Sequence, residues 1–385
     1  MYPKISDLIN DLFGTSINLP IQSYGFMVAM AFVTGYLILS LELRRKEKEG
    51  ILKSLTKKIQ KGLPASPIDI ATSAIFGFII GLKIGGMFLD YSYFAEHPQD
   101  YIMSFKGSWV TAFLIAGLSA YLTWRSKEKE KLPKPITEEI NIRPHENAAS
   151  LVFVAALAGI AGAKLFDIVE HLDDFFADPM GSIFSFSGLA FYGGLIVAAF
   201  AVVWKAKKLN IKLPYISDSA APALMLAYAV GRIGCHISGD GCWGIPNELP
   251  QPEWLSFLPS WMWAFDYPHN VINAGILIPD CHGSHCHVLG TPVFPTALYE
   301  FMICGLFFLV LWGIRKRIHI SGVLFGIYLM LNATERFIIE KIRINIQYDI
   351  ALGIKATQAE MIAIGIFLTG VFWVLWFVNQ HKKAS

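Results

Sequence analysis

Long apolar runs constrain this chain more than any other feature, because about 20 apolar residues in a helix span the ~30 Å hydrocarbon core of a bilayer. Hydrophobic residues make up 54% of the 385 residues, and only 16% are charged. A water-soluble fold cannot bury that much apolar surface. We therefore predict an all-α, polytopic integral membrane protein with about nine transmembrane helices. The runs are 23–42, 68–89, 109–124, 148–169, 188–204, 217–233, 295–314, 321–338 and 358–379.

The distribution of basic residues predicts the orientation of these helices. If the N-terminus is outside, the inside segments contain 23 Lys and Arg and the outside segments contain 5. Loops on the cytoplasmic side of membrane proteins carry an excess of Lys and Arg. The sequence therefore predicts an N-out, C-in topology. The inside segments are 43–67, 125–147, 205–214, 315–320 and 380–385.

Four cations lie within or at the ends of the apolar runs. Lys83 and Lys164 are interpreted as lying near helix ends, where a long side chain reaches the interface. Arg232 and Arg336 fall at the outer ends of their helices, and Glu340 follows Arg336 at the i+4 position. The pair of arginines suits a phosphate group, because guanidinium donates in a planar, bidentate way. The alternative is a structural ion pair.

The segment 234–294 is the longest stretch without a long apolar run, and it contains no Lys or Arg. It is rich in Pro, Trp and Gly, so we expect it to lie at the membrane interface on the outer side. Within "CHGSHCH", we favour a disulfide between Cys281 and Cys286. A zinc site and free thiols remain alternatives.

Two apolar helices resemble each other. "GFIIGLKIGGMFLD" (77–90) and "LAGIAGAKLFDIVE" (157–170) share a G-x-K pattern followed by an acid. This similarity indicates either a duplicated helix or shared packing through small residues.

Seven stretches, in order along the chain, resemble the motifs of the prolipoprotein diacylglyceryl transferase family. They are "QSYGFM" (22–27), "FYGGLI" (191–196), "SDSAAPAL" (217–224), "GRIG" (231–234) with its closing "WG" at Gly244, "FPTALYE" (294–300), "ERFIIEKIR" (335–343) and "TQAE" (357–360). The resemblance implies a bacterial enzyme of the cytoplasmic (inner) membrane, with an active site that opens outward. We expect a single membrane-embedded transferase domain over 1–385, with 234–294 as its periplasmic loop.

The chain departs from the family pattern at several positions. Tyr192 replaces the family's His, Cys235 replaces an Asn, Asp240 replaces a Glu and Asn332 replaces a Tyr. The chain also has about two more helices than the family, interpreted as 68–89 and 109–124. The departures concern residues around the proposed proton transfer rather than the fold.

The resemblance implies a reaction. The diacylglyceryl group of phosphatidylglycerol passes to the thiol of the lipobox cysteine of a prolipoprotein, and glycerol phosphate leaves. Arg232 and Arg336 would hold the phosphate, with Glu340 orienting a guanidinium. Tyr192 is the candidate base or relay for the thiol proton, with Asp240 and His236 as rivals.

The predicted partners are phosphatidylglycerol, prolipoprotein signal peptides and the lipid bilayer, without nucleic acid, cofactor or metal. The predicted catalytic residues are Tyr192, Arg232, Arg336, Glu340 and Asp240. The predicted substrate-binding residues are Tyr24, Gly193, Gly194, Cys235, His236, Gly244 and Glu300. Two other functions remain open: a membrane transporter or ion channel, since buried charges are also typical of these, and a catalytically altered relative that binds lipid or lipoprotein.

Overall fold

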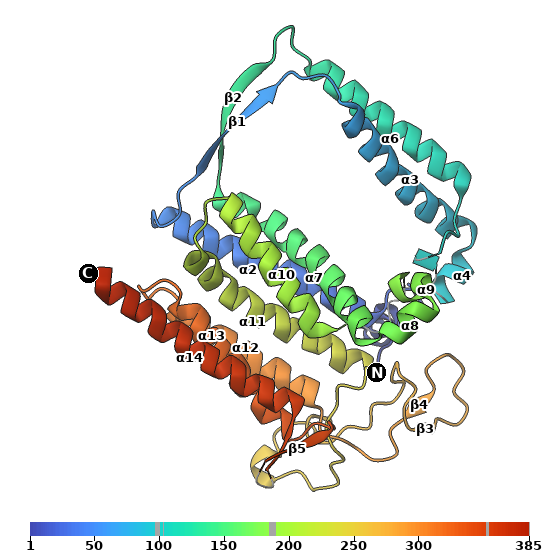
Figure 1. Ribbon diagram of the computed structural model, residues 1–385. Coiled ribbons are helices and arrows are strands. Elements are labelled where there is room, and N and C mark those ends of the chain that lie inside the picture. Colours follow the sequence, from blue (N-terminus) through green and yellow to red (C-terminus); the bar gives the residue numbers. More distant parts are fainter. Residues whose placement is uncertain (97–100, 103, 185–189, 352–353, 385) are drawn as a thin grey trace. The chain divides into compact units, whose positions relative to one another are not determined.

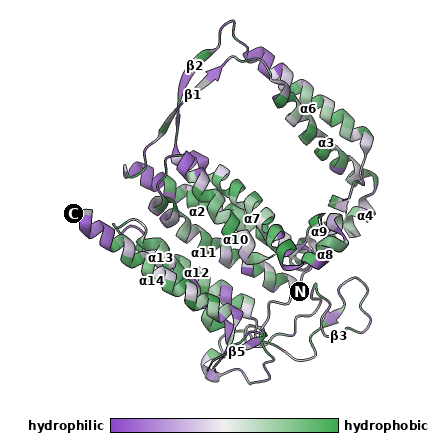
Figure 2. Cartoon of the chain, viewed as in Figure 1, coloured by the Kyte–Doolittle hydropathy of each residue, from purple (hydrophilic) through white to green (hydrophobic). Residues whose placement is uncertain are grey.

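A computed structural model describes the chain except for residues 97–100, 103, 185–189, 352–353 and 385 (Figure 1). The described part is mostly helical, and six of its helices are long and apolar enough to cross a membrane. These are α2 (Ser23–Lys48), α3 (Pro67–Leu89), η1 with α7 (Pro144–Asn147 and Ala148–Glu170), α11 (Leu213–Ser238), α12 (Thr296–Ile314) and α14 (Gln358–Ala384). Figure 2 shows hydrophobic residues along these helices and hydrophilic residues at several of their ends. The prediction of a helical, multi-pass membrane protein is confirmed.

Three further apolar runs also form helices, but they are less suited to span a membrane. They are α6 (Trp109–Glu130), α10 (Phe191–Lys208) and α13 (Val323–Glu340). Three lysines end α10, and α13 carries Glu335, Arg336 and Glu340, so the uncharged length of each is short. Residues 188–189 of the run 188–204 lie outside the described residues. The count of nine spans stays a prediction.

The chain divides into two compact units. The first contains 1–53, 144–156 and 199–385, and the second contains 54–143 and 157–198. Helices α7 and α10 therefore contribute residues to both units.

In the first unit, α11 packs against α2, α12 and α13, and α13 packs against α14. Residues of α11, α12 and α13 form an apolar core that includes Met225, Cys304 and Leu324. A second core joins α2 and α11 with the parts of α7 and α10 in this unit, around Leu43, Leu151 and Ile216. α11 runs antiparallel to α2 and α12, and α13 runs antiparallel to α14, whereas α11 and α13 are parallel and both end on the side of Glu300.

Buried charges hold the end of the first unit opposite Arg232. Glu42, which is 1% exposed, forms ion pairs with Arg45 at 2.8 Å and Arg315 at 2.7 Å. The carboxylate of Asp218 accepts hydrogen bonds from the N–H groups of Gly322 (2.7 Å) and Phe325 (3.0 Å), at the start of α13. The Lys46 ammonium donates to a carbonyl at the start of α11. Each charge therefore ties one helix end to another.

In the second unit, α3 packs against α6, and two strands accompany this helix pair. β1 (Leu55–Lys61) and β2 (Ile136–Ile142) pair antiparallel from Leu55↔Ile142 to Lys61↔Ile136. The sequence predicted only basic loops here. Lysines of β1 pair with glutamates of β2 across the ladder, as Lys58 does with Glu139 and Lys61 with Glu138. The short helices α4 (Tyr91–Glu96), α8 (Leu172–Ala177) and α9 (Pro179–Phe184) complete the unit.

Glycines bring the helices of the second unit close together. A Cβ atom on Gly81 would lie 2.8 Å from the Cα atom of Ala112 in α6. In the other predicted repeat, a Cβ on Gly162 of α7 would lie 2.7 Å from the carbonyl oxygen of Gly193 in α10. Both of the helices that resemble each other thus contact a second helix through small residues. Packing through small residues is one of the two explanations that the sequence allows for their similarity.

Lys83 and Lys164 both have local partners. The ammonium of Lys83 donates to the carbonyl oxygens of Tyr101 (2.6 Å) and Lys106 (3.1 Å), and also to that of Ser104. Lys164 forms an ion pair with Asp167 at 3.0 Å, one helical turn away. Neither lysine belongs to the group of arginines described below.

The loop between α11 and α12 has little regular structure. It contains η2 (Glu253–Leu255), η3 (Ser260–Met262) and the short pair β3 (Ile276–Leu277) and β4 (His287–Val288). The N-terminal segment, with α1 (Ile5–Phe13), is joined to it, because the amino group of Met1 donates to the carbonyl oxygen of Pro268 at 2.7 Å. The hairpin of β5 (Gln347–Ala351) and β6 (Ile354–Thr357) precedes α14.

Candidate functional site

After α11 ends, the chain reverses direction through two glycines. Gly239 caps the helix in the left-handed conformation (φ 64°), and its N–H donates to the carbonyl oxygen of Cys235 at 3.0 Å. Gly241 also has a positive φ, of 91°. The chain therefore brings Cys242 back beside Arg232. The carbonyl oxygen of Cys242 accepts a hydrogen bond from Thr296 Oγ1 at 2.6 Å. The glycines of "GRIGCHISGDGCWG" thus fold the loop over the arginine that precedes them.

Glu300 of α12 is the centre of the site. Its side chain is fully buried and forms ion pairs with three arginines: Arg232, Arg336 at 3.6 Å and Arg343 at 3.1 Å. The arginines come from α11, from α13 and from the segment after α13. Glu300 is thus the anion that gathers the guanidinium groups, and its predicted role in substrate binding stays a prediction.

Glu340 holds the second predicted arginine. Its carboxylate lies 3.0 Å from Arg336 at the i+4 position and also accepts a hydrogen bond from the Asn345 amide. The expectation that Glu340 orients a guanidinium agrees with this contact. Three guanidiniums therefore share two paired carboxylates.

Gly244 allows the chain to reach Arg343. The two residues form an isolated antiparallel bridge, and the N–H of Ile245 donates to the carbonyl oxygen of Ile342 at 2.9 Å. A Cβ on Gly244 would collide with that same carbonyl oxygen. The "WG" that closes the motif therefore has a packing reason: it lets the segment after α13 lie against the loop.

Two thiols and a carboxylate lie beside Arg232. Its Nη1 lies 3.8 Å from the sulfur of Cys235 and 3.7 Å from that of Cys242, within reach of weak hydrogen bonds, and its Nη2 donates to the Tyr228 hydroxyl at 3.0 Å. Asp240 accepts a hydrogen bond from the N–H of Cys242 at 3.1 Å. The hydrogen bond from Cys235, and then the positive charges of Arg232 and Arg343, lower the pKa of the Cys242 thiol.

His236 packs into an aromatic cluster of the loop. Its Nδ1 lies 3.1 Å from the hydroxyl of Tyr267, and its ring stacks on Trp261 with centroids 5.9 Å apart. Burial raises the pKa of Tyr267. Tyr24 lies near the same end of α11, because a Cβ on Gly234 would meet its ring at 3.5 Å. The N-terminal part of α2 thus borders the site.

Tyr192, Gly193 and Gly194 belong to the second unit. The Tyr192 side chain is 40% exposed at the start of α10, and its ring packs edge-on against Phe191. Gly194 faces α7, because a Cβ there would lie 2.8 Å from the carbonyl oxygen of Gly159, and Gly193 faces Phe166 in the same helix. The two glycines therefore have a helix-packing role, while their predicted role against lipid and the catalytic role of Tyr192 stay predictions.

An apolar cavity of about 300 Å³ adjoins the arginine group. It lies between the loop and α12, and Leu255, Met262, Tyr299 and Ile342 are among the residues that line it. Ile342 directly precedes Arg343 in the sequence. The segment that carries Arg343 therefore also contributes to the wall of the cavity.

Sequence reasoning missed four residues of this group: Tyr228, Cys242, Glu335 and Arg343. Arg343 was counted as an outer-loop cation, although its place in "ERFIIEKIR" was a signal for it. Glu335 directly precedes Arg336 in the same motif. It is 1% exposed, and neither of its carboxylate oxygens has a hydrogen-bond partner among the described residues. Tyr228 lies one helical turn before Arg232, which was the available signal.

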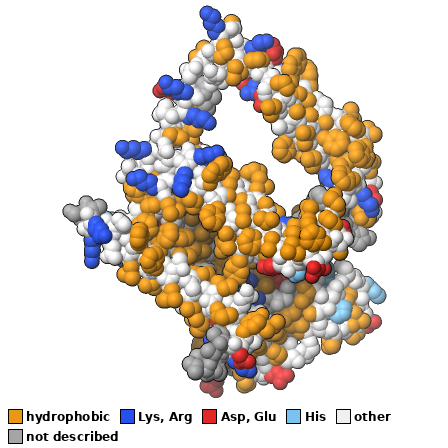
Figure 3. All heavy atoms as spheres, in the orientation of Figure 1, with side chains coloured by type: hydrophobic (Ala, Val, Ile, Leu, Met, Phe, Trp, Pro, Cys, Tyr) orange, Lys and Arg blue, Asp and Glu red, His pale blue; other side chains and the backbone are white. Residues whose placement is uncertain are grey.

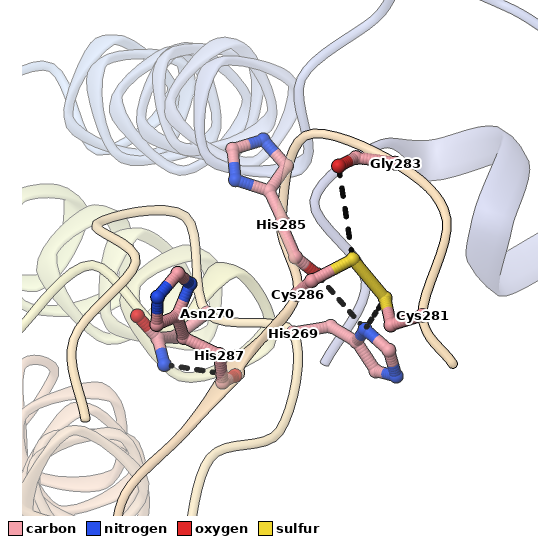
Figure 4. The surroundings of a disulfide bond; sticks show 7 residues. All are labelled: His269, Asn270, Cys281, Gly283, His285, Cys286 and His287. Atoms are coloured by element: carbon pink, nitrogen blue, oxygen red, sulfur yellow. Dashed lines mark hydrogen bonds between the residues drawn. A yellow bond between two sulfur atoms is a disulfide. The ribbon is translucent and has the colours of Figure 1, made fainter. Parts of the chain in front are cut away.

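The disulfide predicted between Cys281 and Cys286 is confirmed (Figure 4). The bonded sulfurs lie beside His269, whose Nδ1–H donates to the carbonyl oxygen of His285 at 2.9 Å. Within the described residues, the histidines of this tract do not gather with other metal-ligating side chains into a candidate metal site. The disulfide therefore closes the tip of the loop.

Comparison with known proteins agrees with the family resemblance of the sequence motifs. A family model described as prolipoprotein diacylglyceryl transferase matches residues 108–376, which include α6 but not α3. A phosphatidylglycerol–prolipoprotein diacylglyceryl transferase of Leptospira interrogans is 26% identical over 301 residues, covering 66% of this chain and 86% of the relative. Proteins of the same name from Dehalococcoides mccartyi (25% over 273 residues, 70% and 87% covered) and Pseudomonas aeruginosa (26% over 239 residues, 60% and 77% covered) are also similar.

Proposed function

Because the chain belongs to the prolipoprotein diacylglyceryl transferase family, we propose that it catalyses the reaction for which its relatives are named. It moves the diacylglyceryl group of phosphatidylglycerol to the lipobox cysteine of a prolipoprotein. The product is a thioether, and glycerol phosphate leaves. This is the first step of bacterial lipoprotein maturation.

The gathering of Arg232, Arg336 and Arg343 around Glu300 is the observation that carries this proposal. The reaction breaks a carbon–oxygen bond, and the negative charge develops on the departing phosphate ester. Preorganised guanidinium donors stabilise such a charge. Glu300 and Glu340 fix the donors before substrate binds, so little reorganisation is needed. The adjoining apolar cavity suits an acyl chain or an apolar side chain of the signal peptide.

The thiol of the acceptor must lose a proton before it attacks. Tyr192, Asp240 and His236 are the candidate groups for this step. Asp240 and His236 lie in the same loop region as Cys242, whereas Tyr192 begins α10. Tyr24, Gly193, Gly194, Cys235 and Gly244 complete the proposed substrate-binding set.

The proposed membrane arrangement is nine spans with the N-terminus outside and the C-terminus inside. Within the first unit, the antiparallel helices support it: α2, α12 and α14 all begin near Arg232, and α11 and α13 end there. The opposite ends carry Lys and Arg, which Figure 3 shows around the C-terminal ends of α2, α10 and α14. The reaction's substrates lie on the outer side of the bacterial inner membrane, which is the proposed location.

The chain is proposed to act as one transferase domain, with 234–294 as its periplasmic loop. Its two units alternate along the sequence, and α7 and α10 contribute to both. A transporter is the less favoured alternative. In the first unit, an apolar layer of α11, α12 and α13 separates the charges near Arg232 from those near Asp218. The other alternative is a catalytically altered relative that binds lipid or lipoprotein, and such a protein would not release glycerol phosphate.

Release of glycerol phosphate from phosphatidylglycerol, with a lipobox peptide as acceptor, tests the proposal. The wild-type protein should catalyse release that depends on the peptide cysteine. Arg232→Lys should lower the rate by about 10²–10³-fold, because an ammonium keeps the charge but not the bidentate donors. Arg317→Lys, at an exposed position at the opposite end, is the matched control. Equal rates for the two variants would contradict the phosphate-binding role, and no release by the wild type would favour the altered relative.

A further inference from the structure

Three metal-ligating side chains meet beside Arg232. The sulfurs of Cys235 and Cys242 and a carboxylate oxygen of Asp240 all lie within 4.8 Å of one another. Cys235 is buried, and the other two are half-buried at the mouth of the arginine group. Among the described residues, no other three His, Cys, Asp or Glu side chains approach this closely in a candidate metal site.

The state of these thiols needs an explanation. Cys281 and Cys286 of the same loop are joined in a disulfide, which indicates that the loop matures in an oxidising compartment. Cys235 and Cys242 are unjoined although their sulfurs are close. Adjacent thiols in such a compartment are prone to oxidation, and a bound metal ion protects them from it. The presence of Asp240 as a third ligand favours the metal, because a disulfide would not need a carboxylate.

The arrangement fits a tetrahedral zinc ion with one open position. Zinc binds cysteine sulfur at about 2.3 Å and carboxylate oxygen at about 2.0–2.2 Å, which places tetrahedral ligands about 3.6–3.8 Å apart. The three atoms therefore need to close by about 1 Å at most. Two thiolates, one carboxylate and Zn²⁺ together carry a single negative charge, and Arg232 donates towards both sulfurs. Hydrogen-bond donors that contact the ligand atoms without binding the metal are typical of metal sites.

We propose that Cys235, Asp240 and Cys242 bind a zinc ion whose fourth position takes the acceptor thiol. This use of the site rests on the transferase function proposed above. Zinc binding displaces the protons of the two protein thiols into water. The acceptor thiol then binds the ion as a thiolate and its proton also passes to water, so that Asp240 serves as a metal ligand and not as the base for this step.

The bond changes balance without a redox partner. The zinc-bound sulfur attacks the glyceryl carbon and forms a carbon–sulfur bond. The carbon–oxygen bond to phosphate breaks, and its electron pair leaves with glycerol phosphate beside the arginines. The neutral thioether product is a weaker ligand than a thiolate, so it leaves the ion and frees the open position for another acceptor.

Metal analysis of the full-length protein, purified in detergent without chelators, tests this proposal independently of activity. We expect one zinc per chain. Replacement of zinc by Co²⁺ should produce a thiolate-to-cobalt charge-transfer band and the visible bands of a tetrahedral ion. Cys235→Ser and Cys242→Ser should each lose at least about 10-fold in zinc affinity. Cys304→Ser is the matched control, because Cys304 is the third free cysteine and lies in the apolar core.

Several results would overturn the zinc site. One is a wild-type protein that contains no stoichiometric zinc. Another is a cobalt-substituted protein without a sulfur-to-cobalt charge-transfer band. Both measurements use the wild-type protein, so they do not depend on whether a variant folds. Others are a Cys235–Cys242 disulfide by intact mass, or zinc unchanged in both variants. If zinc is bound but its removal leaves transfer unchanged, the thiol-binding role is wrong. If the zinc protein releases no glycerol phosphate, the proposed function fails while the site stands.

Discussion

Glu300 determines how the arginines of the site are arranged. A fully buried carboxylate is costly unless it is paired, and three guanidiniums pair with this one. The guanidiniums in turn need the carboxylate, because each is largely buried and its charge would otherwise lie uncompensated. Glu300 therefore positions the three arginines that are proposed to contact the phosphate.

Glu300→Gln keeps the shape of the side chain and removes its charge. We expect a loss of about 10²-fold or more in transfer rate and a lower Tm, since breaking a buried ion pair costs about 3–5 kcal/mol. Thermal unfolding in detergent and the glycerol phosphate assay measure the two effects. Glu248→Gln, at an exposed position of the loop, is the control. An unchanged Tm and rate would show that the arginines do not depend on this charge.

At the scale of elements, glycine contacts hold α3 to α6. A Cβ on Gly81 would lie 2.8 Å from the Cα of Ala112 and would also collide with the carbonyl oxygen of Thr111. Membrane helices gain stability from such close approach, because lipid competes equally for larger apolar side chains. The helix pair thus depends on the size of a few residues rather than on its mean hydropathy.

Gly81→Leu should separate α3 from α6 and lower the Tm, because an overpacked contact typically costs about 1–3 kcal/mol. Gly117→Leu is the matched control, since a Cβ on Gly117 of α6 meets nothing within 4 Å. Thermal unfolding of both variants in the same detergent compares them. Similar melting temperatures would mean that the glycine contacts do not hold this pair.

At the scale of the whole molecule, the proposed N-out, C-in topology rests on the distribution of basic residues. The 23 cations assigned to inside segments are expected to stay on the cytoplasmic side, because moving such charges across the membrane is unfavourable. The loop with the disulfide and the arginine group then faces outward, where phosphatidylglycerol and the acceptor thiol meet.

Cysteine labelling tests this topology. Lys58→Cys and Pro250→Cys are introduced separately after Cys235, Cys242 and Cys304 have been replaced by serine, so that only the new thiol reacts. A membrane-impermeant maleimide should label position 250 in intact cells and position 58 only after lysis. Labelling of position 58 from outside would reverse the orientation and remove the outward-facing site.

The sequence by itself determined the helical membrane class and the family motifs, and it favoured the Cys281–Cys286 disulfide that the structure shows. These depend on local patterns: apolar runs of spanning length, ordered short motifs and cysteines five residues apart. The Arg336–Glu340 pair also follows from helical spacing. Tertiary structure alone decided that Arg343 joins Glu300 and that Cys242 returns to Arg232. These contacts link segments far apart in sequence, and they depend on how the loop folds back at Gly239 and Gly241 and on the close approach of Gly244 to Ile342. No local pattern encodes such a contact, because its partner is specified elsewhere in the chain.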